Sequence, residues 1–372
     1  MTPRRGGRAL AAALLVGATA ALADPPHTAL PAAPWTRVDP IPLGGSGVNA
    51  PIRLSDGRLA VFTRAPSSLV LVDPVTGATR SSPVEEPPST EFAPRCDRRG
   101  RLVVLGAGGT LFRLGIDGRV RVAAQLPGAL HGLVERPDGT EVAVVSNPQS
   151  NLAFVTLRAD GGIASVRSVA AGPIGSPVTL ADGHVAMGVP RGLAVFEPAG
   201  TIRLVPGVEN PRHLITVRDA TLAVTERAVF PLDADGVPGP PRALPGAIRG
   251  WSASGDGEAL MWTVGTPAAL LRIDAAGAIR RFDAPEFTDW AMVDAVGAML
   301  VVSRTGRLVA LEPDGSRRWV VDLQRNTPGQ RGIVPQVTPG DRGDAWVTTV
   351  DGELLHLWSP PTSSQEAPRA NR

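Results

Sequence analysis

The sequence predicts an all-β protein built as a single β-propeller of about eight four-stranded blades, with seven blades as the alternative count. Turn residues recur along the chain at intervals of 37 to 46 residues, which is the repeat length of propeller blades. The composition is 43% hydrophobic and is interrupted by 37 Pro and 42 Gly. The apolar runs between these turns are short and show no sustained helical periodicity.

Each repeat contains a short strand, a tight turn, two apolar strands and an outer polar strand. The first copy runs through residues 51–61, 68–73 and 76–80. Asp-Gly pairs such as Asp56-Gly57 are strong hairpin signals, because Gly and Asp tolerate the positive φ of these turns. The corresponding turn positions in the eight repeats are Gly57, Gly100, Gly139, Gly183, Ala220, Gly257, Gly297 and Gly343.

The strands after these turns are almost continuously apolar, as in residues 101–105, 141–145 and 300–303. Strands that are buried on both faces have this pattern, and neighbouring blades bury each sheet in that way. The weakest repeat is the fifth, at residues 211–245, and it leaves the count of seven blades open.

The eighth repeat, Val337 to Trp358, lacks a fourth strand. The segment from Trp35 to Leu43 has the pattern of an outer strand with no repeat of its own. We therefore expect this segment to join the last blade and close the ring, because an open ring would leave two exposed edges. The propeller is expected to span residues 35–358.

The N-terminus has the pattern of a secretory signal peptide over residues 1–23, with a basic start, a short apolar run and a small-residue cleavage site. Arg4-Arg5 leaves both general secretion and twin-arginine export open. Residues 24–34 form a Pro-rich leader, and residues 359–372 are expected to be a disordered tail. We expect a periplasmic or secreted protein with no lipid anchor and no transmembrane segment in the mature chain.

Charge and cysteine content limit the possible partners. The predicted signal peptide contains three arginines and no acid, so its removal lowers the formal net charge from +2 to −1. A chain with a net charge of −1 has little electrostatic attraction for a polyanion, and we therefore expect no nucleic-acid partner. Cys96 is the only cysteine, so the fold has no intramolecular disulfide. We expect Cys96 to act as a small residue near the start of a strand, in preference to a reactive free thiol.

Arg307-Leu-Val-Ala-Leu-Glu-Pro-Asp-Gly-Ser-Arg-Arg-Trp319 resembles the repeat of quinoprotein-like (PQQ-like repeat) propellers, and Leu69–Arg80 is similar. Residues 130–145 are partly similar to lactonase-type and NHL-type repeats. The quinone-dependent members, as the resemblance implies, use a pair of adjacent cysteines, which this chain lacks. The resemblance therefore implies a non-catalytic exported propeller that binds partners and holds no cofactor.

The sequence has no haem-attachment, zinc-protease, serine-hydrolase or phosphate-loop motif. Catalysis is therefore not favoured, and no catalytic residue or metal site is assigned. In a propeller, the innermost strands begin around one mouth of the central channel, where convergent polar groups can bind a ligand. The candidate ligand-binding residues at this mouth are Asn49, His131, Arg212, His213, Arg249, Asp289, Trp290 and Gln336.

Two functions follow from these observations. The first is a non-catalytic binding or scaffold module, expected to be a monomer, which recognises an unidentified protein or small ligand through the loops of one face. The alternative is a metal-dependent enzyme of the lactonase or lyase type, with one divalent ion at the channel mouth. Its ligands would come from Glu91, Asn49, Asn210 and Asp289, and its general base would be His131 or His213.

Overall fold

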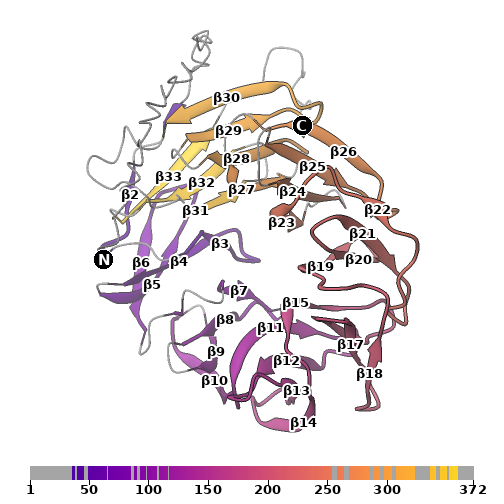
Figure 1. Ribbon diagram of the computed structural model, residues 1–372. Helices are drawn as coiled ribbons and strands as arrows, with labels where there is room; N and C mark the ends of the chain where they lie inside the picture. The colour runs from indigo at the N-terminus through magenta and orange to yellow at the C-terminus, as the bar shows by residue number, and fades with distance from the viewer. Residues whose placement is uncertain are drawn as a thin grey trace, which may run out of the picture. The chain divides into compact units, whose positions relative to one another are not determined.

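Eight antiparallel sheets follow one another around a common axis in the computed structural model of the chain (Figure 1). The structure describes residues 36–37, 40–45, 49–64, 66–84, 88–89, 93–97, 99–106, 109–115, 117–253, 258–263, 268–284, 288–293, 297–303, 307–322, 336–340, 344–349 and 352–358. No helix occurs among them, and therefore none that is long and apolar enough to cross a membrane. The fold is an eight-bladed β-propeller, as the turn spacing predicts.

Each of the first four blades contains four strands, ordered from the axis outward. Blade 1 has β3 (Ile52–Arg53), β4 (Leu59–Arg64), β5 (Ser67–Val72) and β6 (Thr79–Pro83). Blade 2 has β7 (Arg95–Cys96), β8 (Leu102–Leu105), β9 (Thr110–Leu114) and β10 (Val120–Gln125). Blade 3 has β11 (Ala129–Glu135), β12 (Glu141–Ser146), β13 (Leu152–Leu157) and β14 (Ile163–Val169). Blade 4 has β15 (Ile174–Thr179), β16 (Val185–Val189), β17 (Gly192–Phe196) and β18 (Ile202–Val205).

The next three blades repeat this order. Blade 5 has β19 (His213–Val217), β20 (Ala220–Val224), β21 (Ala228–Leu232) and β22 (Arg242–Ala243). Blade 6 has β23 (Ile248–Ala253), β24 (Ala259–Thr263), β25 (Ala269–Ile273) and β26 (Ile279–Asp283). Blade 7 has β27 (Thr288–Val293), β28 (Met299–Ser303), β29 (Arg307–Leu311) and β30 (Arg317–Asp322). The weak fifth repeat thus forms a full blade, and the count is eight.

Blade 8 closes the ring with both ends of the described chain. It contains β31 (Gln336–Pro339), β32 (Ala345–Thr348) and β33 (Glu353–Trp358), and its outer positions are filled by β1 (Thr36–Arg37) and β2 (Ile41–Pro42). Thr36 pairs with Trp358, and Ile41 pairs with Leu354. The predicted closure is therefore confirmed from Thr36 onward, while Trp35 lies outside the described residues.

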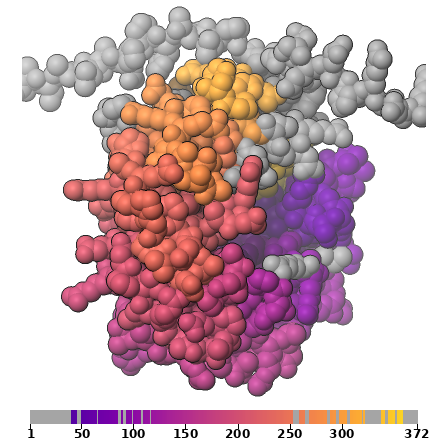
Figure 2. Space-filling model, turned by 90° about the vertical axis from the view of Figure 1, so that its right-hand side faces the viewer, coloured from indigo at the N-terminus to yellow at the C-terminus, as the bar shows by residue number. Residues whose placement is uncertain are grey.

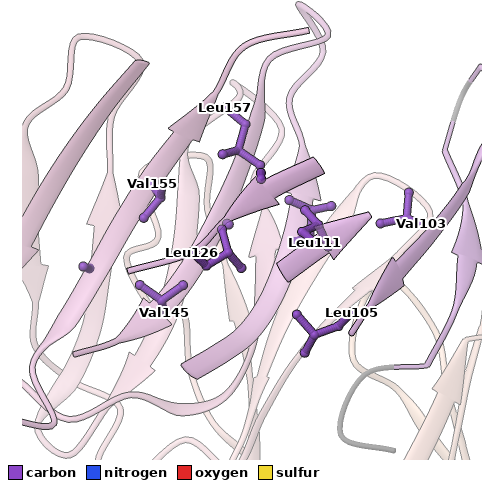
Figure 3. Packing of buried hydrophobic residues seen from close by; sticks show 11 residues of the cluster. Val103, Leu105, Leu111, Leu126, Val145, Val155 and Leu157 are labelled. Carbon is purple, nitrogen blue, oxygen red and sulfur yellow. The ribbon is translucent and has the colours of Figure 1, made fainter. Parts of the chain in front are cut away.

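The core consists of apolar layers between blades. Among the described residues, the buried apolar side chains form eight clusters, one for each pair of neighbouring blades. Between blades 2 and 3, for example, Leu111 and Val103 lie on one side and Val145 and Val155 on the other (Figure 3). Both faces of each middle strand are buried, which explains the continuous apolar runs in the sequence.

The chain direction defines two faces of the ring. The inner strands begin at what we call the start face, where the second strand of each blade ends. They end at the turn face, where tight turns lead to the second strand. The turn of blade 5 differs from those of blades 1, 2, 3, 4 and 7, because Ala220 already begins β20 and the positive φ of 53° falls on Arg218.

The described residues all belong to one compact unit, which spans residues 33–372. Within this unit the outer strands of successive blades follow one another along the side of the ring, in chain order from magenta to orange in Figure 2. The predicted signal peptide (1–23), the leader (24–34) and the tail (359–372) lie outside the described residues, so their assignments stay predictions.

Candidate functional site

All eight predicted ligand-binding residues lie at the start face, in or just before the inner strands of six blades. Asn49 stands three residues before β3, Arg212 directly precedes β19, and the other six lie within the first three residues of their strands. They are His131 in β11, His213 in β19, Arg249 in β23, Asp289 and Trp290 in β27, and Gln336 in β31. Ligand binding by these residues stays a prediction.

Three of these residues are bulged out of the strand ladder at equivalent places. In blade 3 the register passes from Leu130 to Gly132 and skips His131. The registers of β23 and β27 skip Arg249 and Asp289 in the same way. A β-bulge leaves one residue unpaired and changes the direction of its side chain, and bulges are common beside functional sites.

Close packing requires the glycine after the first bulge. A Cβ atom on Gly132 would lie 2.4 Å from Cδ of Pro177 in β15. The inner strand of blade 3 therefore packs at Gly132 against the ring of Pro177 in blade 4, with no room for a further side chain. This contact holds the backbone at the His131 bulge in place.

Arg249 and Asp289 form an ion pair between blades 6 and 7. A guanidinium nitrogen of Arg249 lies 2.5 Å from Oδ1 of Asp289. The carboxylate is 12% exposed and the guanidinium side chain is 42% exposed. Because a guanidinium carries five N–H donors, the pair leaves donors of Arg249 available to solvent or to a ligand.

His131 is paired with a hydroxyl in its own blade. Its Nε2 lies 2.9 Å from Oγ of Ser146, at the end of β12. Burial lowers the pKa of His131, so the ring is neutral at neutral pH. A neutral imidazole next to a hydroxyl can act as hydrogen-bond donor or acceptor, according to its tautomer.

Polar side chains near the end of the second strand bind the hairpin that follows in several blades. In blades 1, 5, 6 and 7 these are the hydroxyls of Thr63, Thr225, Thr263 and Ser303. In blade 3 this hairpin is bound by Asn147, whose Oδ1 accepts hydrogen bonds from the N–H groups of Gln149 and Asn151 at 3.0 and 2.9 Å.

The second histidine has a different environment. His213 pairs regularly with Val224, so β19 carries no bulge at this residue. Burial, and in smaller part the positive charge of Arg212, lower the pKa of His213. Arg212 itself forms an exposed ion pair with Glu226. The start face therefore holds two neutral imidazoles beside two paired arginines.

Asn49 and Trp290 have structural contacts. Oδ1 of Asn49 accepts a hydrogen bond of 2.9 Å from the N–H of Phe62, and its Nδ2 donates one of 2.5 Å to the carbonyl of Ala50. Trp290 is half-buried against the apolar clusters on both sides of blade 7. The backbone of Gln336 pairs with Thr348, while its side chain lies outside the described set.

The metal ligands considered for the enzyme alternative have other contacts. The amide of Asn49 binds backbone, and Oδ1 of Asp289 pairs with Arg249. Asn210 is exposed with a positive φ of 48°, and Glu91 lies outside the described residues. Within the described part of the chain, a group of three metal-ligating side chains occurs at the turn face, at Asp182, His184 and Asp235.

A charged cavity also lies at the turn face, between blades 2 and 3. Its volume is about 170 Å³, and its lining includes Asp97, Arg101, Glu135 and Glu141. Arg101 pairs with Asp97 at 2.7 Å. The sequence analysis missed this cavity because its residues come from different turns. No local motif in the sequence groups these charges.

Cys96 is half-buried against the cluster between blades 1 and 2. Burial, and in smaller part the negative charges of Asp97 and Asp56, raise the pKa of its thiol. A raised pKa disfavours the thiolate, which is the reactive form. This environment favours the expected role of a small packing residue.

These features define the class as an eight-bladed β-propeller whose start face carries bulged and paired polar groups. Among solved structures, the chain is similar to the C-terminal WD40 domain of Sif2 (TM-score 0.64, 10% identity, covering 89% of this chain and 99% of that one). It is also similar to the computationally designed Ika8 protein (0.61, 13%, 86% and 98%) and to virginiamycin B lyase from Staphylococcus aureus (0.54, 11%, 87% and 98%).

No protein-family model matches the chain, and no curated protein matches it either. Likeness to solved structures at such low identity shows the fold alone, since propellers serve many functions. The propeller part of the predicted resemblance is confirmed. Membership of the quinoprotein-like family stays a prediction.

Proposed function

We propose that this chain is an exported, non-catalytic binding or scaffold module that docks a partner protein on the start face of its propeller. The observation that carries the proposal is the repeated bulge at His131, Arg249 and Asp289. Three blades depart from regular pairing at the same strand position and on the same face. Bulges of this kind are maintained where a side chain must point in a particular direction.

The electrostatics of the start face favour binding over catalysis. In the Arg249–Asp289 pair and in the Arg212–Glu226 pair, the positive and the negative charge cancel. Both His131 and His213 are neutral. The remaining guanidinium and imidazole groups suit hydrogen-bond acceptors, such as the backbone carbonyls of a partner's extended segment.

The closed ring provides the rigidity that docking requires. Inner strands of successive blades are joined by side chain–backbone hydrogen bonds, as from Thr338 Oγ1 to the Pro51 carbonyl at 2.6 Å and from Thr179 Oγ1 to the Glu135 carbonyl at 3.2 Å. Binding groups on a rigid scaffold lose little entropy on association. Groups from four blades can thus act as one preformed surface.

The test is affinity capture from envelope extracts with the wild type and with Arg249→Ala and Arg212→Ala variants. Arg121→Ala is the matched control, because Arg121 forms an exposed ion pair with Asp117 on the turn face. We expect one protein to be retained by the wild type and the control and to be depleted at least tenfold with the start-face variants. Equal retention by all four chains would exclude the start face as the docking surface.

Export is part of the proposal and rests on the signal-peptide pattern in residues 1–23. Expression of the full chain followed by N-terminal sequencing of the periplasmic fraction tests it. The expected mature protein begins at Asp24. A protein that keeps its original N-terminus and stays in the cytoplasmic fraction would refute export and leave the docking proposal to be judged separately.

An enzymatic function of the lactonase or lyase type is the second candidate, and the His131–Ser146 pair favours it. A neutral imidazole 2.9 Å from a hydroxyl has the geometry of a general base next to a nucleophile. A panel of lactones and cyclic esters, assayed with the wild type, His131→Ala and Ser146→Ala, tests this function. Turnover that either substitution abolishes would replace the binding proposal, and the absence of turnover across the panel would exclude these substrates.

A further inference from the structure

Three potential metal ligands from two neighbouring blades converge at the turn face. Asp182 and His184 flank the turn between β15 and β16 of blade 4, and Asp235 lies in the turn between β21 and β22 of blade 5. One ligand atom from each side chain lies within 4.8 Å of the other two. Asp235 is 51 positions from His184 in the sequence, so no local motif groups the three residues.

Close packing fixes the backbone of both turns. A Cβ atom on Gly183, whose φ is +85°, would lie 3.3 Å from Cδ of Pro137 in blade 3. A Cβ atom on Gly236, whose φ is +77°, would lie 3.1 Å from Cγ2 of Val195 in blade 4. The turn between β21 and β22 of blade 5 thus packs against blade 4. This packing places Asp235 next to Asp182 and His184.

The ligand atoms of Asp182 and His184 face each other at a distance that one ion can bridge. Oδ1 of Asp182 accepts a hydrogen bond of 3.1 Å from the N–H of His184, and Oδ2 faces the ring. The buried Nδ1 of His184 lies 2.9 Å from that Oδ2. Two ligands bound to one ion at about 2.0–2.1 Å each are separated by about 2.8–3.4 Å.

The charges around the site also favour a cation. Asp182, Asp235 and the nearby Glu197 carry three negative charges. Arg203 and Arg136 supply two positive charges, since Arg203 lies 3.4 Å from Oδ1 of Asp235 and 3.4 Å from Oε1 of Glu197, and Arg136 donates a hydrogen bond of 3.2 Å to the Glu197 carbonyl. Arg203 competes with an ion for Asp235, but its shorter bond of 2.8 Å goes to the backbone carbonyl of that residue. The other carboxylate oxygen of Asp235 can therefore turn towards the histidine.

We infer that Asp182, His184 and Asp235 bind one Zn²⁺ ion that bridges blades 4 and 5 on the turn face. One imidazole nitrogen with two carboxylate oxygens suits Zn²⁺, whereas Ca²⁺ and Mg²⁺ prefer oxygen ligands throughout. Three protein ligands leave a coordination position for water or for a donor from another molecule. The site is separate from the proposed docking surface, which lies on the opposite face.

The experiment is isothermal titration of Zn²⁺ into the metal-free mature chain, prepared without a polyhistidine tag, with zinc content measured after gel filtration. The wild type is expected to bind one Zn²⁺ per chain. Asp235→Asn and His184→Ala are each expected to weaken binding at least tenfold. Asp235 is 67% exposed at its side chain, so its substitution leaves folding intact and keeps the test decisive.

His356→Ala is the matched control. Nε2 of His356 lies 2.6 Å from Oδ2 of Asp344, which is also a histidine–aspartate pair at the turn face. Its substitution is expected to leave the zinc affinity unchanged. A wild type without stoichiometric zinc, or an affinity that Asp235→Asn and His356→Ala change equally, would overturn the inference. Either result would leave the docking proposal untouched, because capture on the start face is measured independently.

Discussion

Arg113 is completely buried between blades 2 and 3, and its guanidinium forms an ion pair with the carboxylate of Glu141. Arg113 occupies β9 at a place where blades 1, 4, 5 and 7 have an apolar side chain. Arg272 occupies the equivalent place in β25 of blade 6 and pairs with Glu258. Buried pairs of this kind cost much to desolvate, and the loss of one partner leaves an uncompensated charge in the core.

The first prediction concerns this pair. Arg113→Ala is expected to lower the free energy of unfolding by about 3–5 kcal/mol, because Glu141 would keep a buried charge without its partner. Urea denaturation of the mature protein measures the change. In Arg121→Ala, which breaks an exposed pair, the loss should stay below about 1 kcal/mol. Similar losses in the two variants would contradict the role of burial.

A second prediction concerns ring closure. Leu43 is buried in the cluster between blades 8 and 1 and donates its N–H to the Gly352 carbonyl at 2.7 Å. Leu43→Ala should lower the free energy of unfolding by about 2–5 kcal/mol, because it leaves a cavity at the closing blade. Val75→Ala, at a side chain that is 91% exposed, is the control and should change it by less than about 0.5 kcal/mol. Equal thermal denaturation curves for both variants would show that closure contributes little.

The third prediction distinguishes a structural role of Asn49 from a role in partner binding. Asn49→Ala leaves the N–H of Phe62 without its acceptor, and the expected loss is about 1–3 kcal/mol of unfolding free energy. Affinity for a captured partner should remain within twofold at a temperature where the variant is folded. A variant with unchanged stability and lost partner binding would instead place Asn49 among the ligand contacts.

The fourth prediction is a pH dependence of stability. Burial lowers the pKa of both His131 and His213 below about 6.5, the value expected in the unfolded chain. The unfolded chain therefore binds these protons more readily. Stability is fully present above pH 6.5 and falls as the pH drops below it.

Melting temperatures between pH 5 and 8 test this dependence. The His131→Gln/His213→Gln double variant should show a flatter profile than the wild type over this range. The turn aspartates whose pKa is lowered, such as Asp73 and Asp138, titrate below about pH 4 and do not contribute here. Parallel profiles for the two proteins would show that neither ring is coupled to folding.

Local sequence signals predicted the fold well. Turn chemistry at Gly57 or Gly139 and apolar runs such as residues 141–145 depend on neighbouring residues, and they recur often enough to give the repeat length. The missing outer strand of the eighth repeat and the unassigned strand near the N-terminus predicted the closure by the same logic. Among the predicted turn positions that the structure describes, the one in blade 5 differed, because Arg218 takes the positive φ there.

The sites were less predictable because their contacts cross between blades. The ion pair of Arg113 with Glu141 and the approach of Asp235 to Asp182 depend on the rotation between neighbouring sheets. No local pattern encodes that rotation. The bulges were also invisible in the sequence, since a single extra residue at His131 or Arg249 resembles ordinary variation in strand length. A repeat alignment anchored on the turn positions would have brought Asp182 and Asp235 to the same face.

The pairing of β1 and β2 with β33 has a consequence for how the molecule forms. Blades 1 to 7 are built from contacts within short stretches of chain, whereas Thr338 and Pro51 meet across 287 residues. Contacts of such high contact order form late. During synthesis or translocation, β1 and β2 therefore stay without their partner β33 until the residues of blade 8 are available. For that interval, the edge of β33 in one copy can pair as well with the N-terminal strands of another, so crowded chains are exposed to domain swapping through this blade.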